Sequence, residues 1–461
     1  MHINLMNDDT ICALATAPGM GAIAVVRLSG RNSHAIACSI FSRGDNRLDP
    51  ADIISHKAYY GQINDDDGFL DEVLITFFKG PHSYTGEDSV EISIHGSPFI
   101  QQRLLELLFS RGARMADAGE FTMRAFAHHR FDLAQAEAVA DLIASHSKAA
   151  HHLAVNQMRG GYSDTIKKLR QQLIDFTVLI ELELDFAEEE VEFADRSRFF
   201  SLLATLKDEI RRLIDSFQAG NAIKNGIPTA IIGRPNVGKS TLLNAILNED
   251  KAIVSDIPGT TRDSIEDLFV INGYTFRFID TAGLRSNSDD AIENLGIERS
   301  YEKMKQASII LYVADASSFD ISELSQFEEQ IHDNSKHFVL VLNKTDKAAP
   351  ILQPSIDIPI ISISAKHRIN LEILETKLYE IGKEIMDSQD TVVSNARHVQ
   401  ALKKAAHALC SVEEGFRDGL PTDLAAIDLH VALEALSTIT GDEITNDEVL
   451  KNIFGKFCIG K

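Results

Sequence analysis

The segment Gly233-Arg-Pro-Asn-Val-Gly-Lys-Ser-Thr241 constrains the fold more than any other part of the chain. It has the spacing of a phosphate-binding loop, in which a glycine is followed by four residues and then by glycine, lysine and a hydroxyl residue. A short apolar run, 230–232, precedes the segment, and an apolar helical pattern, 242–247, follows it. A strand, a loop and a helix N-terminus in this order direct backbone N–H groups at phosphates. The segment therefore predicts an α/β nucleotide-binding domain.

Two side chains of this loop have defined roles in triphosphate chemistry. We expect Lys239 to reach the β- and γ-phosphates and the Ser240 hydroxyl to bind Mg²⁺. The loop residues expected to contact the nucleotide are Asn236, Val237, Gly238, Lys239, Ser240 and Thr241.

Two later segments have the composition expected around the γ-phosphate and its metal ion. The run 256–263, Asp-Ile-Pro-Gly-Thr-Thr-Arg-Asp, provides Thr261 as the candidate second Mg²⁺ ligand. The run 280–283, Asp-Thr-Ala-Gly, provides the Gly283 N–H for the γ-phosphate and Asp280 for a metal-bound water. The expected nucleotide contacts in these runs are Asp256, Ile257, Pro258, Gly259, Thr260, Thr261, Asp280, Thr281, Ala282 and Gly283.

A predicted hairpin leads into the second of these runs. Asn272-Gly273 joins the apolar runs 268–271 and 274–279, and Asn-Gly between such runs is the strongest short hairpin signal.

Two segments near the end of this region indicate which base is bound. The apolar run 338–342 leads to Asn343-Lys344-Thr345-Asp346, and the run 360–363 leads to Ser364-Ala365-Lys366 as a second base contact. The carboxylate of Asp346 accepts two donors, which suits N1–H and the amino group of guanine. Adenine lacks that donor pair and would leave the carboxylate unpaired. Five motifs in this order, each after an apolar strand, predict a GTP-binding domain.

The residue after the Asp-x-x-Gly run departs from the Ras-like pattern. Many Ras-like GTPases place a water-orienting glutamine there, but this chain has Leu284. Another group must position the attacking water, or hydrolysis is very slow. The polar stretch 286–299 contains the candidates Asp289, Asp290, Glu293 and Glu298, among which spacing alone does not choose.

Length and composition limit the remaining possibilities. With 461 residues, of which 44% are hydrophobic, the chain predicts two or three domains with substantial cores. Its four cysteines have no paired spacing and indicate neither a zinc site nor a disulfide framework. No apolar run approaches a membrane span, and the N-terminus lacks the pattern of a signal peptide. We expect a cytoplasmic protein that does not associate with a membrane.

The net charge of −23 argues against nonspecific wrapping of nucleic acid. It leaves open an RNA substrate held at a local basic patch or by a partner subunit.

Hydrophobic periodicity divides the chain into parts. The stretch 131–220 has helical periodicity, and residues 399–409 and 429–436 have it again. Runs 22–28, 73–78 and 90–95 are typical of strands separated by Gly and Pro turns. We expect an N-terminal α+β domain, 1–120, and a helical domain, 121–221 and 381–461, into which a Ras-like α/β P-loop GTPase domain, 222–380, is inserted.

Several motifs along the chain resemble those of the bacterial and organellar tRNA modification GTPases called MnmE or TrmE. They are Asp9-Thr-Ile and Gly30, Tyr84-Thr-Gly-Glu-Asp88, Gly119-Glu-Phe-Thr122, Asp132-Leu-Ala-Gln-Ala-Glu137, Asp280-Thr-Ala-Gly-Leu-Arg285, Gly296-Ile-Glu-Arg299 and the terminal Phe457-Cys-Ile-Gly-Lys461. The resemblance covers essentially the whole chain. It implies a homodimer that acts with an FAD-dependent partner subunit, in a heterotetramer, on the 5-position of wobble uridine in certain tRNAs.

The resemblance also implies a tetrahydrofolate site in a folate-binding-like N-terminal domain that mediates dimerisation. A 5-formyl- or methylene-tetrahydrofolate would supply a one-carbon unit that becomes part of a carboxymethylaminomethyl or aminomethyl group. The family's folate contacts correspond to Arg27, Glu87, Arg130 and Lys461, where Arg130 replaces the lysine that the family often has. Cys458 corresponds to the family's carboxy-terminal cysteine. It has either a functional role or a structural role as a small buried apolar residue.

A potassium ion replaces an arginine finger in the family. Its contacts correspond to Asn236, Ser255, Ile257 and Thr260, and Ser255 thereby joins the nucleotide site. A fixed cation beside the β–γ bridge offsets charge that develops in the transition state. By its spacing from Gly296, Glu293 corresponds to the residue that orients water, and Arg285 is a candidate electrostatic helper.

Two other functions remain compatible with the motifs. A GTP-dependent ribosome-assembly factor would share them, although no Gly-x-x-Gly loop of an RNA-binding KH module follows residue 380. A GTP-gated scaffold without folate chemistry would leave the N-terminal domain and Cys458 with structural roles only.

Overall fold

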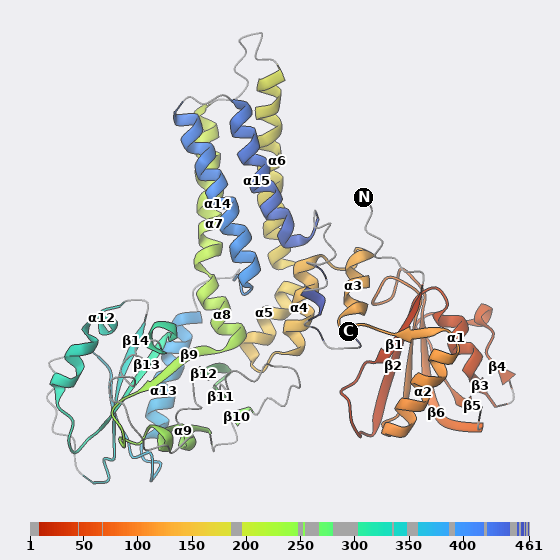
Figure 1. Ribbon diagram of the computed structural model, residues 1–461, viewed down its shortest axis with the longest axis horizontal. Coiled ribbons are helices and arrows are strands. Elements are labelled where there is room, and N and C mark those ends of the chain that lie inside the picture. Colours follow the sequence, from red (N-terminus) through yellow and green to blue (C-terminus); the bar gives the residue numbers. More distant parts are fainter. Residues whose placement is uncertain are drawn as a thin grey trace. The chain divides into compact units, whose positions relative to one another are not determined.

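The computed structural model has two β-sheets connected by helices (Figure 1). The residues that it describes are 9–44, 46–66, 68–185, 196–247, 252–253, 267–279, 303–333, 336–347, 358–386, 392–418, 422–442, 450, 453–455, 457 and 460. The chain divides into two compact units. Unit 1 comprises residues 1–140, 157–194 and 410–461, and unit 2 comprises residues 141–156 and 195–409.

Unit 1 contains an eight-stranded sheet with the strand order β4-β3-β5-β6-β7-β2-β1-β8. All neighbouring strands are antiparallel except β1 and β8, which are parallel. The strands are β1 Thr10–Leu14, β2 Ile23–Ser29, β3 Phe41–Arg43, β4 Asn46–Arg47, β5 Ala58–Asp65, β6 Gly68–Phe78, β7 Ser89–His95 and β8 Ala113–Met115. The strands predicted at 22–28, 73–78 and 90–95 are thereby confirmed.

One face of this sheet forms the core of the N-terminal region. Along β6 the buried side chains Val73, Ile75 and Phe77 alternate with less buried neighbours, which is the two-residue period of a sheet covered on one side. The helices α1 Ser33–Ile40 and α2 Pro98–Ser110 contribute to the same hydrophobic cluster.

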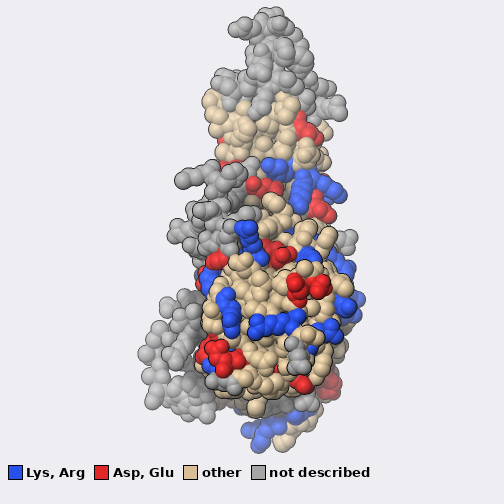
Figure 2. Space-filling model, turned by 90° about the vertical axis from the view of Figure 1, so that its right-hand side faces the viewer, with Lys and Arg blue, Asp and Glu red and all other residues tan. Residues whose placement is uncertain are grey.

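On the side of unit 1 that Figure 2 shows, lysine and arginine side chains are interspersed with aspartate and glutamate side chains.

Helices follow the sheet in sequence. Unit 1 includes α3 Glu120–Ala127, α6 Gly161–Asp185 and α15 Thr422–Thr440, whereas the boundary between the units falls within α4 Leu133–Ile143, α5 Lys148–Met158 and α14 Ala396–Arg417. Helix α6 packs along α15, and Arg170 Nε donates to Ser437 Oγ at 2.8 Å. These helices confirm the predicted helical periodicity of residues 131–185, 399–409 and 429–436, whereas residues 186–195 of the predicted stretch lie outside the described residues.

The motif Asp132-Leu-Ala-Gln-Ala-Glu137 has an architectural role at the start of α4. Asp132 Oδ1 accepts from the Gln135 N–H, and Gln135 Oε1 accepts from the Asp132 N–H, so the two residues form a reciprocal cap. Asp132 also accepts from Ser163 Oγ at 2.9 Å and from Lys167 Nζ at 3.0 Å, both on α6. Gln135 donates to the Met158 carbonyl oxygen. The motif therefore fixes how three helices meet.

The C-terminal segment returns to unit 1 and packs beside α3 and α4. Leu450 and Phe454 form a buried cluster with Leu133 and Ala136. Gly119, the residue before α3, has a φ of 69°, and a Cβ at this position would lie 2.5 Å from the Phe454 carbonyl oxygen. Only glycine combines this backbone conformation with so close an approach.

Unit 2 contains a seven-stranded sheet with the strand order β10-β11-β12-β9-β13-β14-β15. The strands from β12 to β15 in this order are parallel, and the pairs β10–β11 and β11–β12 are antiparallel. They are β9 Ile227–Ile232, β10 Ala252–Ile253, β11 Asp267–Ile271, β12 Tyr274–Phe278, β13 Ile309–Asp315, β14 His337–Asn343 and β15 Ile360–Ser362. The predicted hairpin at Asn272-Gly273 and the strands before the guanine motifs are confirmed.

Hydrophobic clusters cover both faces of this sheet, as a doubly wound α/β fold requires. One cluster includes α9 Lys239–Leu247 and α13 Leu371–Met386, and the other includes the 3₁₀ segment η3 Ile321–Phe327, which leads into α12 Glu328–Ile331. The helices α7 Arg196–Asp215 and α8 Phe217–Asn225 precede the sheet in sequence, and α14 follows it. No helix among the described residues is both long enough and apolar enough to cross a bilayer.

Candidate functional site

The phosphate loop of unit 2 connects the end of β9 to the start of α9. Asn236 has a left-handed φ of 62° and Gly238 a φ of 98°. A Cβ at Gly238 would overlap the side-chain amide of Asn343, so this glycine allows β14 to approach the loop. Ser240 and Thr241 lie in the first turn of α9, and the backbone N–H groups and dipole of a helix N-terminus favour an anion.

Lys239 is held at the mouth of this loop by backbone carbonyl groups. Its Nζ donates to the Gly233 carbonyl at 2.8 Å and to the Arg234 carbonyl at 2.7 Å. Burial lowers the pKa of Lys239, and the nearby charge of Lys303 lowers it further. The two carbonyl contacts place an ammonium donor against the loop that is expected to bind the phosphates.

Asn343 connects the phosphate loop to the second guanine motif. Its Nδ2 donates to the Val237 carbonyl at 2.9 Å, and its Oδ1 accepts from the Ala365 N–H at 2.9 Å. The side chain is 3% exposed. Asn343 therefore fixes the distance between two loops that both contact the nucleotide in the predicted site.

Lys344 makes a second connection to the phosphate loop. Its Nζ donates to the Asn236 carbonyl at 2.6 Å and pairs with Asp315 Oδ2 at 2.9 Å. Partial burial raises the pKa of Asp315, but hydrogen bonds from Ser317 and Lys344 outweigh it and lower the pKa to about 2. Asp315 is therefore ionised at neutral pH and orients the lysine.

Asp346 is arranged as an acceptor for the base. Its Oδ1 accepts from Ser364 Oγ at 2.6 Å, and its Oδ2 lies 3.7 Å from His367 Nε2. The hydrogen bond from Ser364 is the largest of the causes that lower the pKa of Asp346. The carboxylate is therefore ionised at neutral pH, as two donors of guanine would require. Thr345 N–H donates to the Ile363 carbonyl, and Lys366 follows in the adjoining loop.

Sequence reasoning missed Asp315 and Glu323 beside this site. Glu323 Oε2 accepts from Tyr312 Oη at 3.0 Å and lies 3.2 Å from Arg234 Nε in the phosphate loop. Asp315 ends β13, and the carboxyl ends of parallel strands meet at the ligand-binding edge of such sheets. The position of Asp315 at the end of a strand could have identified it as a site residue, whereas the sequence around Glu323 contains no such signal.

Several predicted site residues lie outside the described residues. They are Ser255, Asp256, Ile257, Pro258, Gly259, Thr260, Thr261, Asp280, Thr281, Ala282, Gly283, Arg285, Glu293, Cys458 and Lys461. The structure brings together the predicted residues of the phosphate loop, 343–346 and 364–366.

Unit 1 contains a second group of predicted residues, on the sheet face opposite the α1–α2 core. The Arg27 guanidinium lies 5.0 Å from the centre of the Tyr84 ring and 5.7 Å from that of Phe121, and it pairs with Glu91 at 2.8 Å. Glu87 accepts from Ser29 Oγ at 2.8 Å, and Ser29 lies two residues along β2 from Arg27 on the same face.

Arg130 lies at the same loop. A Cβ at Gly86 would lie 3.4 Å from Arg130 Cγ, so this side chain passes beside the residue before Glu87. Three of the four predicted folate residues therefore meet around residues 84–88. The fourth, Lys461, lies outside the described residues, but its neighbour Gly460 packs against the backbone of Leu14 and Ala15.

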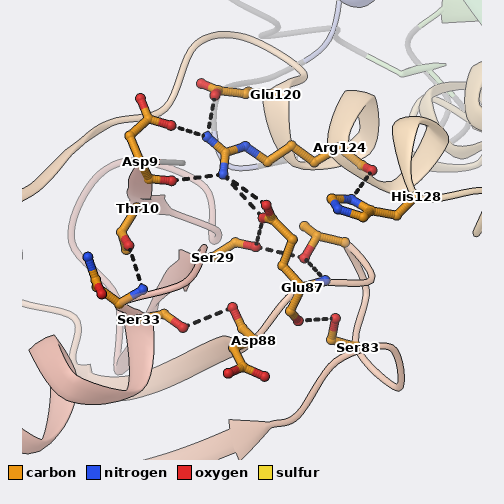
Figure 3. Close-up of polar contacts among 12 residues, drawn as sticks. Asp9, Thr10, Ser29, Ser33, Ser83, Glu87, Asp88, Glu120, Arg124 and His128 are labelled. Carbon is orange, nitrogen blue, oxygen red and sulfur yellow. Dashed lines mark hydrogen bonds and ion pairs between the residues drawn. The ribbon is translucent and has the colours of Figure 1, made fainter. Parts of the chain in front are cut away.

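An ion cluster that the sequence did not reveal lies behind Glu87 (Figure 3). The buried guanidinium of Arg124 contacts Asp9 at 2.7 Å, Glu120 at 3.0 Å and Glu87 at 3.2 Å. Arg114 pairs with Glu120 at 2.6 Å and also contacts Asp9. Burial alone would raise the carboxyl pKa values, but hydrogen bonds from the two arginines lower the pKa of Asp9 and of Glu120. Asp9 and Glu120 stood in motifs noted above, yet their spacing gave no sign that they meet.

Comparison with known proteins gives two family matches and many whole-chain relatives. Residues 10–130 match the family described as GTP-binding protein TrmE N-terminus, and residues 133–458 match the MnmE helical domain. A tRNA modification GTPase MnmE of Flavobacterium johnsoniae is 49% identical over 470 residues, covering 99% of this chain and 100% of the relative. Proteins of the same name from Flavobacterium psychrophilum and Cytophaga hutchinsonii are 50% and 52% identical, each covering 99% of this chain and 100% and 98% of the relative.

Proposed function

The chain belongs to the MnmE family of tRNA modification GTPases, and on that premise we propose that it modifies C5 of wobble uridine with folate-derived carbon. It is a GTP hydrolase that acts in tRNA modification. The product proposed is a carboxymethylaminomethyl or aminomethyl group. A homodimer of this chain would carry out this modification in the cytoplasm, together with an FAD-dependent partner subunit.

The convergence of Arg27, Glu87 and Arg130 supports the proposed folate site. A folate ring offers N–H donors and an aromatic face, and its tail carries carboxylates. Glu87 provides an acceptor, the Tyr84 and Phe121 rings beside Arg27 provide aromatic surface, and the two arginines provide charge for the tail. Lys461 would complete the set. When bound, the folate would supply the one-carbon unit.

The GTP site would bind and orient its nucleotide through residues of unit 2. Asp346 and the loop 364–366 would recognise guanine, and Lys239 would contact the β- and γ-phosphates. The hydroxyl of Ser240, at the N-terminus of α9, would bind a Mg²⁺ ion, and Thr261 would be the second ligand. Asn236, whose carbonyl accepts from Lys344, would hold a K⁺ ion together with Ser255, Ile257 and Thr260. The two ions would offset phosphate charge.

Hydrolysis would use residues of the segment after Asp280. Glu293 would orient the attacking water in place of the glutamine that Leu284 replaces, and Arg285 would assist electrostatically. The net charge of −23 favours a division of labour in which the partner subunit supplies much of the attraction for tRNA.

Nucleoside mass spectrometry of bulk tRNA from cells that lack this gene tests the proposal. We expect 5-carboxymethylaminomethyl- or 5-aminomethyl-type wobble uridines to disappear and to return with the wild-type gene but not with Glu293→Ala. An unchanged nucleoside profile would refute the proposed chemistry, and sedimentation with ribosomal subunits would then test a role in ribosome assembly.

A further inference from the structure

We propose that Arg124 is a positioning residue that holds Glu87 in the direction in which it accepts N–H donors of the folate. This inference rests on the proposed folate site. The side chain of Arg124 is 4% exposed and that of Glu87 is 19% exposed. A ligand in the site therefore reaches Glu87, whereas Arg124 lies behind it and acts on the ligand only through that carboxylate.

The geometry of the cluster fixes Arg124 independently of Glu87. Nη2 donates to Asp9 Oδ1 at 2.7 Å and to Glu120 Oε1 at 3.0 Å, and Nη1 donates to the Asp9 carbonyl at 3.0 Å. The contacts from Nη1 to the two oxygens of Glu87 are longer, 3.2 and 3.3 Å. Asp9 and Glu120 therefore hold the guanidinium in place. Nη1 also faces the carboxylate of Glu87.

Arg124 has the further effect of limiting the directions that Glu87 can adopt. Glu87 Oε2 accepts from Ser29 Oγ at 2.8 Å as well as from Arg124. Ser29 Oγ in turn lies 2.7 Å from Thr85 Oγ1, and the Glu87 N–H donates to that same Thr85 oxygen. With a strand residue on one side and a buried cation on the other, the carboxylate is oriented before a ligand arrives. Such preorganisation reduces the free energy lost on binding.

The charges of the cluster leave an acceptor at its surface. Asp9, Glu87 and Glu120 carry three negative charges, and Arg114 and Arg124 carry two positive charges. Asp9 and Glu120 each contact both arginines, whereas Glu87 contacts only Arg124 within this group of five. The excess negative charge is therefore located at Glu87, whose side chain is 19% exposed, so donors of a ligand can use it.

A double-mutant cycle separates positioning from a merely structural role. Calorimetry of the full-length protein would measure the affinity for 5-formyltetrahydrofolate of the wild type, Arg124→Gln, Glu87→Gln and the double variant. Because a bond to a charged group is lost, we expect Arg124→Gln to weaken binding about 10- to 100-fold. In the Glu87→Gln background the same change should cost less than about threefold, because the carboxylate that Arg124 acts on is absent.

Two further variants control for folding. Arg124→Lys retains a cation but not the fork of donors, so we expect it to recover part of the affinity that Arg124→Gln loses. Arg103→Gln removes another arginine–carboxylate pair of unit 1, the one with Asp65 at 2.9 Å, and should leave folate affinity unchanged. Equal losses from Arg124→Gln with and without Glu87 would overturn the positioning role while leaving the folate site intact. Absence of binding by the wild type would instead overturn the folate site and this inference with it.

Discussion

Replacing Asn343 with alanine tests whether this side chain holds the nucleotide-binding loops of unit 2 together. The change removes one bond to the Val237 carbonyl and one from the Ala365 N–H, both buried. No side-chain atom of alanine can replace either partner. Two backbone groups would then lose their partners in a region from which water is largely excluded, since Asn343 is only 3% exposed.

The expected loss of stability follows from these two groups. Leaving a buried polar group without a partner costs about 1–3 kcal/mol, and we take the lower half of this range because water can enter the loops from the nucleotide side. The sum is about 2–4 kcal/mol of unfolding free energy, which corresponds to a fall in Tm of about 5–15 °C for a domain of this size. Affinity for guanine nucleotides should also fall, because both affected loops are expected to contact the nucleotide.

Differential scanning calorimetry of the full-length protein measures this effect. The transition of the GTP-binding domain is identified as the one that GDP shifts to higher temperature, since a ligand stabilises only the part that binds it. Asn225→Ala is a matched control in the same unit, because its side chain makes a single exposed bond to Asn221. If Asn343→Ala lowers the GDP-responsive transition no more than Asn225→Ala does, the connecting role of Asn343 is refuted.

Three further changes test other parts of the argument. Gly119→Ala should release the C-terminal segment and raise hydrogen exchange around Phe454, because the added Cβ would meet the Phe454 carbonyl. Gly112→Ala is the control, because Gly112 has a φ of 98° but open space around it. Equal exchange in both variants would contradict the packing argument. The folded pKa of Asp315, about 2, lies below its unfolded value, so its contribution to stability is present at neutral pH. That contribution should be lost as the pH falls from about 4 towards 2, and the difference between wild type and Asp315→Asn in urea unfolding should shrink over that range; a constant difference would speak against it. Glu293→Ala should bind GTP normally and hydrolyse it about 10²-fold more slowly, and near wild-type turnover would exclude the proposed role of Glu293. GTP turnover by the wild type should be faster in KCl than in NaCl.

Much of the fold could be predicted because its signals are local. The phosphate loop, the Asn272-Gly273 hairpin and the strands before the guanine motifs are each specified by a few consecutive residues, and the structure has them at those positions. The helices of the described parts of 131–220 are likewise specified by their periodicity. The sequence also predicted that the GTP motifs meet, because the carboxyl ends of parallel strands share one edge of the sheet.

Residues that depend on distant partners escaped the sequence argument. Val237 and Asn343 are 106 positions apart, and each was expected to contact nucleotide, but the bond that joins their loops was not foreseen. Asp132 and Gln135 were noted only as part of a motif, although their role is to cap α4 and to hold α5 and α6 against it.

The sequence by itself therefore determined the nucleotide-binding fold, the order of its motifs and the family, because these depend on short segments whose geometry is set within a few residues. The tertiary structure alone decided that Asp9 and Arg124, 115 positions apart, share one buried cluster with Glu87. Such a cluster depends on the register of antiparallel strands, on the path of the 84–88 loop and on how α3 approaches the sheet. None of these is encoded by the spacing of charged residues along the chain, because a buried ion pair is selected by the desolvated space that the whole fold creates.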